Sequence, residues 1–265
     1  MKKKKSKKFN KVVPILLIVL SLFIILFLFL GLIRKFDKGD YRVESRVKNI
    51  EKAKVKDTDG ISTVGWLRVQ GTNIDYPVIY APGVDLNYRT QDFVWTENNF
   101  DSLNNMVYIS GHNIKNLSKT PLIADKSHSR FEQLMSFVYL DFIEKNQYIQ
   151  YTFNGENYLY KIYSVYFDDI NNLDLYNSEK YSATDLNSII GNSLDKNIYV
   201  IDTDINEKDI FISLNTCTRM FGDQQLIVNA RLVRNGEEVK LSKVKKSSNY
   251  VGVNNVLKGG NSDEA

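Results

Sequence analysis

The chain has 265 residues, of which 43% are apolar and 12% aromatic, so it has enough apolar side chains for a sizeable core and does not have a disordered or coiled-coil composition. Nine of its 35 Lys and Arg precede residue 36, whereas none of its 31 Asp and Glu do. The remaining 26 basic and 31 acidic residues give residues 36–265 a net charge of −5. This excludes nucleic acid as an expected partner, because phosphate binding depends on clustered basic charge.

The N-terminus has the pattern of a membrane anchor. Residues 1–11 contain seven Lys, and the following run Val12–Ile33 has 22 residues without a charge. At about 1.5 Å per residue this run crosses the roughly 30 Å hydrocarbon core, while the apolar region of a signal peptide has only about 7–15 residues. The lysines predict a cytoplasmic N-terminus. We therefore predict a single-pass protein of the cell membrane, with its folded part outside the cell.

Residues 34–59 are predicted to form a helical extension between the anchor and the folded domain. Apolar residues recur there at spacings of four and three among many charges, as in an amphipathic helix. From residue 60 the pattern changes to short strands and turns, and the Asn154-Gly155 turn marks the clearest hairpin. The predicted strands are 65–69, 74–79, 106–110, 148–153, 158–167, 198–201, 210–217 and 226–233.

The connections carry two predicted helices. A polar insertion at 116–129 precedes a helix over 130–144, and Thr184 is in position to cap a short helix before the strand at 198–201. Past Gly236 the chain is rich in Lys, Ser, Asn and Gly. We therefore predict a flexible tail over 236–265, which leaves 60–235 as the folded domain.

The chemistry-bearing residues are few. Cys217 is the only cysteine, so the chain cannot form an internal disulfide. A thiol attacks as thiolate and needs a neighbouring base, and the chain has two histidines. His112 follows a glycine at a predicted strand end, whereas His128 lies in the polar insertion. The sequence favours His112 as the partner of Cys217, and the alternative is an inert cysteine beside a structural histidine.

Three segments resemble one family. Ser213–Cys217 (SLNTC) resembles the sortase signature TLxTC with Ser in place of the first Thr, and Ser110–Asn113 (SGHN) resembles its GHN stretch. Gly65–Leu67 together with Gly71–Val78 resembles the N-terminal part of the class B sortase domain. The likeness covers roughly residues 60 to 235 and is specific through the order and spacing of the three segments.

The resemblance implies a mainly β fold, a closed eight-stranded barrel with an N-terminal helix and a helix in the connection before the Cys strand. It also implies that Cys217 is the nucleophile and His112 the general acid and base of a transpeptidase. Sortases cleave a C-terminal sorting signal after a Thr and hold the acyl group as a thioester. They transfer it to an amine of a peptidoglycan precursor or of a pilin Lys. The implied partners are therefore surface proteins or pilins and the membrane.

One position departs from the family. Sortases usually have an Arg near the start of the strand after the Cys, and counting back from residues 226–228 places Gln225 in that slot. A Gln amide donates a hydrogen bond but carries no charge, so it stabilises an oxyanion less than a guanidinium does. Arg219, close to Cys217 in sequence, is the alternative stabiliser.

Two other readings stay open at this point. The chain could be an anchored β-barrel binding or scaffold module whose Cys and His are incidental, or a cysteine hydrolase in which water resolves the thioester. No residue spacing resembles a metal or cofactor site, so we predict neither a metal nor a cofactor.

Overall fold

The structure is a computed structural model. It describes residues 14, 17 and 19–25 near the N-terminus, and then 43–54, 62–80, 94–96, 105–113, 131–169, 171–172, 181–218 and 224–252. The chain divides into two units, residues 1–40 and 41–265. In the first unit residues 19–25 are helical, and most of the predicted span Val12–Ile33 lies outside the described residues. No helix in the described ranges is long and apolar enough to cross a membrane.

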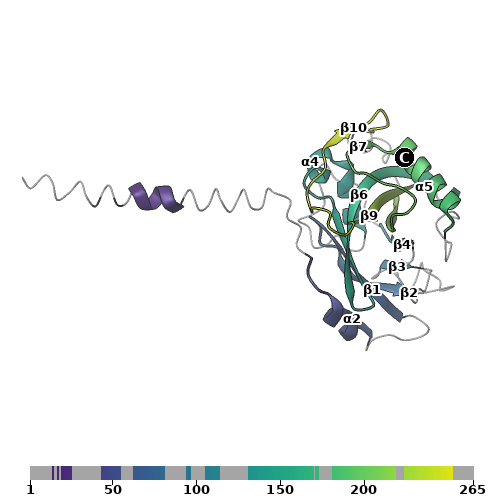
Figure 1. The fold of residues 1–265 in the computed structure, drawn as a ribbon, viewed down its shortest axis with the longest axis horizontal. Coiled ribbons are helices and arrows are strands. Elements are labelled where there is room, and N and C mark those ends of the chain that lie inside the picture. Colours follow the sequence, from purple (N-terminus) through teal and green to yellow (C-terminus); the bar gives the residue numbers. More distant parts are fainter. Residues whose placement is uncertain are drawn as a thin grey trace, which may run out of the picture. The chain divides into compact units, whose positions relative to one another are not determined.

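The second unit is built on a closed barrel with the strand order β1-β2-β3-β4-β8-β9-β6-β5 (Figure 1). Neighbouring strands are antiparallel except for the parallel pairs β2–β3 and β4–β8. The predicted mainly β, eight-stranded closed barrel is confirmed. The strands are β1 (Ser62–Val69), β2 (Asp75–Tyr80), β3 (Val94–Thr96), β4 (Met106–Gly111), β5 (Tyr148–Phe153), β6 (Glu156–Asp169), β8 (Phe211–Thr218) and β9 (Gln224–Leu232).

Alternating side chains give the barrel a filled interior. Exposure alternates residue by residue along β1, as expected for a strand with one face in a core. The β5–β6 hairpin turns at Asn154 and Gly155, both with positive φ (48° and 81°), which is the geometry that joins twisted strands. The inward residues of the strands form the main core, for example Ile109, Leu214 and Val228, each with 0% exposure.

A second, smaller core lies on the outer face of the barrel. Helix α5 (Ala183–Lys196) packs on β6 (Figure 1). Its Leu186 and Ile189 join a cluster with outward residues such as Tyr108 and Phe211. α5 is the predicted helix before the Cys strand, but its N-cap is Ser182, not Thr184. Ser182 and Asp185 form a reciprocal capping box, which satisfies two backbone donors.

The helix predicted over 130–144 is broken in two. A 3-10 helix, η1 (Glu132–Val138), is separated from α4 (Leu140–Ile143) by Tyr139, whose backbone is extended. All seven residues of η1 are buried, including Gln133, whose side chain accepts a hydrogen bond from the Asn73 backbone at 2.7 Å. The helix predicted in the N-terminal extension is present as α2 (Val47–Lys54).

The C-terminal segment is folded where a flexible tail was predicted. β10 (Val244–Lys246) pairs with β7 (Tyr199–Ile201) in a separate two-stranded sheet. The Tyr148 hydroxyl donates to the Lys240 carbonyl at 2.6 Å, and Gln147 exchanges two hydrogen bonds with the Ser242 backbone. Hydrogen bonds to its backbone groups hold the segment against the rest of the domain. Its polar composition gives no sign of these bonds. Residues 253–265 lie outside the described residues.

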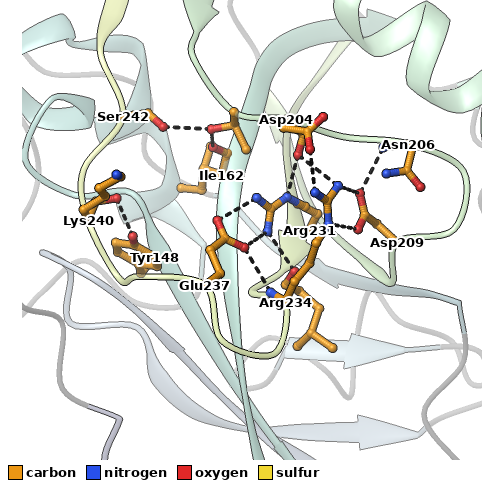
Figure 2. A network of polar contacts seen from close by, with 12 residues as sticks. Tyr148, Ile162, Asp204, Asn206, Asp209, Arg231, Arg234, Glu237, Lys240 and Ser242 are labelled. Carbon is orange, nitrogen blue, oxygen red and sulfur yellow. Dashed lines mark hydrogen bonds and ion pairs between the residues drawn. The ribbon is translucent and has the colours of Figure 1, made fainter.

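A buried ion pair fixes the start of this segment (Figure 2). Arg231, 2% exposed, donates two hydrogen bonds to the Glu237 carboxylate at 2.6 and 2.7 Å and a third to the Asp204 carbonyl. Next to it, Arg234 makes a bidentate pair with Asp209. The hydrogen bonds from Arg231 lower the pKa of Glu237 from 4.5 to about 2.

Replacing Glu237 by Gln is expected to lower the free energy of unfolding by about 3 kcal/mol at pH 7, because it leaves the buried Arg231 charge without its counterion. A group with a depressed folded pKa stabilises above its unfolded pKa, so this contribution is present above pH 4.5 and is lost as the pH falls toward 2. Urea unfolding of the wild type and the Glu237→Gln variant between pH 7 and the acid range measures the difference in their free energy of unfolding.

The matched control is Glu238→Gln, because Glu238 forms only an exposed pair with Lys240 at 3.4 Å. It is expected to change the free energy of unfolding by less than about 0.5 kcal/mol. Equal losses in the two variants would contradict a stabilising role of the buried pair.

Candidate active site

Cys217 lies near the end of β8 on the outer face of the barrel, and its side chain is exposed. Alternation along the strand places Asn215 on the same face and Thr216 on the opposite one. The Thr216 hydroxyl donates to the Gly111 carbonyl at 2.7 Å, which ties β8 to β4. The thiol is thus the accessible end of an otherwise buried strand.

His112 is placed beside Cys217 by the parallel pairing of β4 and β8. In this register Ser110 faces Asn215 and Gly111 faces Thr216, so the next residue along, His112, comes level with Cys217. Adjacent strands lie about 4.8 Å apart, and residues level with each other in a parallel pair project to the same face. The half-buried imidazole and the thiol are therefore expected on the same face of neighbouring strands.

Trp95 supports one side of the imidazole. Its ring lies 4.9 Å from the His112 ring, centroid to centroid, with 51° between the planes, and its side chain is 8% exposed. β3 carries Trp95 level with Ser110 of β4. The indole restricts the orientation of the imidazole. Sequence reasoning missed Trp95, since only strand pairing brings it to the histidine.

Gln225 lies directly across from Cys217. In the antiparallel pairing of β8 and β9 the two residues are register partners, with Cβ atoms about 5 Å apart in such pairs. Gln225 is 4% exposed, and its side-chain oxygen accepts a hydrogen bond from the Asn215 amide. The sequence analysis had assigned Gln225 to the usual Arg slot by counting back from residues 226–228. The structure places this residue opposite Cys217 on the neighbouring strand. Arg219 and His128 lie outside the described residues.

Asp168 extends this row to a third strand. It is the register partner of Gln225 on β6 and is 3% exposed. Its carboxylate accepts from Lys196 at 2.6 Å, Asn172 at 2.7 Å and Asn192 at 3.1 Å, so it anchors α5 beside the row. Burial alone would raise the pKa of Asp168, but these hydrogen bonds outweigh it and hold the pKa below its usual value. The sequence analysis gave no sign of this anchor.

The arrangement brings a thiol, an imidazole and a neutral amide into one outer row. Such a set suits acyl transfer through a thioester. The described part of the chain holds no group of three His, Cys, Asp or Glu that could bind a metal ion.

Comparison with known proteins finds similarity to sortase B proteins. No family model matches the chain. A curated sortase B of Listeria monocytogenes is 24% identical over 182 residues, which are 64% of this chain and 69% of that protein. The crystal structure of Clostridium perfringens sortase B matches with a TM-score of 0.57 and 22% identity, covering 71% of this chain and 99% of that one. A Staphylococcus aureus sortase B–substrate complex matches with a TM-score of 0.54 and 20% identity, covering 71% and 84%.

Proposed function

We propose that the chain is a cysteine transpeptidase of the class B sortase type, which transfers surface proteins or pilins to an amine through a thioester on Cys217. The observation that carries this proposal is the β4–β8 register, which brings His112 level with an exposed Cys217. A cysteine with an adjacent base is the arrangement that nucleophilic acyl transfer requires.

The first half of the reaction acylates the enzyme. The Cys217 thiolate attacks the carbonyl carbon of the scissile peptide bond and forms a tetrahedral oxyanion. The C–N bond then breaks, and protonated His112 gives its proton to the leaving amine. The second half reverses these roles. An incoming amine attacks the thioester, the C–S bond breaks, and His112 takes the proton of the amine as the thiolate leaves.

Gln225 is proposed as the donor to the oxyanion. Its pairing with Cys217 supports a contact between its amide and an acyl group carried by the thiol. A neutral amide binds an oxyanion more weakly than the Arg that the family usually has at this position, so the Gln predicts a slower enzyme. Arg219 stays a candidate for supplying the missing charge from outside the described residues.

The expected partners follow from the matched proteins. The Staphylococcus aureus sortase B was solved as a substrate complex, and another matched sortase B, 19% identical with a TM-score of 0.56, is complexed with triglycine, a peptide with a free amino group. For this chain we propose a C-terminal sorting signal as acyl donor. The proposed acceptor is a cell-wall or pilin amine. The uncharged run Val12–Ile33 would keep the domain at the outer face of the membrane.

Product analysis separates the proposal from its two rivals. The full chain in detergent is mixed with fluorogenic peptides carrying a Thr before the scissile bond, together with a labelled amine donor. A transpeptidase gives the labelled amide as the main product. A free acid as the only product would make the chain a cysteine hydrolase, and binding of peptide without cleavage would make it a binding module.

A further inference from the structure

We propose that Asn215 is a positioning residue that sets which end of the Gln225 amide faces the reacting carbonyl. The inference rests on the proposed function, in which Gln225 stabilises the oxyanion. A Gln amide has one donor end and one acceptor end of nearly equal size. An amide turned with its oxygen toward an oxyanion would repel it, so a Gln in this position is useful in only one orientation.

The hydrogen bond from Asn215 selects that orientation. Asn215 Nδ2 donates to Gln225 Oε1, and both side chains are buried, at 3% and 4% exposure. With its oxygen held by Asn215, the amide directs its nitrogen away from Asn215. Cys217 follows Asn215 by two residues on the same face and is the register partner of Gln225. The donor end of the amide is therefore the end left for an acyl group on the thiol.

The neighbour on the other side forms no hydrogen bond with this nitrogen in the described part of the chain. Asp168 is the register partner of Gln225 on β6. Its Oδ1 accepts three hydrogen bonds, from the Asp169 backbone, Asn172 and Lys196, and its Oδ2 accepts one from Asn192. Gln225 is not among these donors, and the hydrogen bond it makes to a described residue is the one that its oxygen accepts from Asn215. Gln225 is thus held at its oxygen and left available at its nitrogen.

This role exists only because position 225 is a Gln. A guanidinium donates from all its nitrogens and needs no neighbour to choose an end. Asn215 should therefore matter for the rate when Gln225 is present and lose that importance when an Arg replaces it. A double-mutant cycle on positions 215 and 225 should therefore show coupling, with a larger loss of rate from the Asn215 change when Gln225 is present.

The test is Asn215→Asp, which keeps the shape of the side chain and replaces its donor by an acceptor. In the wild-type background we expect kcat for acylation to fall about 10- to 100-fold with little change in KM, because loss of one oxyanion donor costs on the order of 10²–10³-fold. In the Gln225→Arg background the same change should cost less than about 3-fold. The kcat of Asn215→Ala should lie between those of wild type and Asn215→Asp. The Ala variant releases the Gln225 amide without turning its oxygen toward the reacting carbonyl.

Three controls keep the result interpretable. Asn229→Asp puts a carboxylate on the same face of β9 without contacting Gln225, so it reports the cost of a buried charge alone. Thermal unfolding shows whether each variant folds. If Asn215→Asp does not fold, Asn215→Ala takes its place in the double-mutant cycle. The Cys217 alkylation rate of each folded variant corrects kcat for the change in thiolate fraction that a new charge beside the thiol causes.

Equal losses in the two backgrounds, or no loss in either, would overturn the positioning role. Absence of any Cys217 adduct in the wild type would instead overturn the proposed function itself. These two failures are distinguishable, because the second appears before any Asn215 variant is made.

Discussion

Replacing Cys217 by Ala is expected to lower the rate of peptide cleavage by about 10⁴-fold or more, because loss of a nucleophile removes the covalent route and leaves only weak assistance from the rest of the site. The side chain is exposed and is not among the residues of the main core, so the fold should be unchanged. Initial rates with a fluorogenic peptide at saturating amine measure the loss, and thermal unfolding of the variant checks the fold.

A residual rate within 10-fold of wild type in the Cys217→Ala protein would contradict the proposed nucleophile. It would also remove the reason to treat the row formed by Cys217, Gln225 and Asp168 as an active site. The chain would then be better described as a sortase-like scaffold.

His112→Gln is expected to lower the rate of amide cleavage by about 10²–10⁴-fold, because a leaving amine must be protonated as the C–N bond breaks. An aryl ester of the same peptide releases a phenolate, which needs no proton. The loss on the ester should therefore be at least about 10-fold smaller than the loss on the amide. Parallel kinetics on the two substrates measure this difference.

The other histidine provides a matched control. His128→Gln removes the same chemical group from the predicted polar insertion and should change either rate by less than about 2-fold. Equal losses on amide and ester in the His112 variant would indicate that His112 acts on the fold or on the thiol alone, and would contradict its role as proton donor to the leaving group.

Local patterns predicted seven of the eight barrel strands and missed the three-residue β3, and the predicted strand 198–201 is β7 of the separate sheet; the closed barrel itself was implied by the family resemblance. Alternation, the Asn154-Gly155 turn and the three family segments are all readable over a few residues, and they led to Cys217, His112 and Gln225. What they could not give is register. Trp95, Asn215 and Asp168 gain their places from pairings between strands far apart in the chain, and no local pattern carries that information.

Two elements were predicted wrongly for reasons that composition cannot reveal. The segment after Gly236 looks like a tail by its polar residues, but its backbone and the Arg231–Glu237 pair attach it to the barrel. The helix expected over 130–144 becomes a 3-10 helix followed by a short α-helix, because η1 is buried on every side and no amphipathic period applies.

The central claim is that Cys217 carries the acyl group as a thioester. Intact-mass measurement of the full chain, quenched in acid seconds after mixing with a sorting-signal peptide and no amine, tests it directly. We predict a mass increase equal to the N-terminal fragment acid less one water, absent from Cys217→Ala and removed by a later addition of amine. Cleavage of the peptide with no adduct on the wild-type chain would contradict the claim.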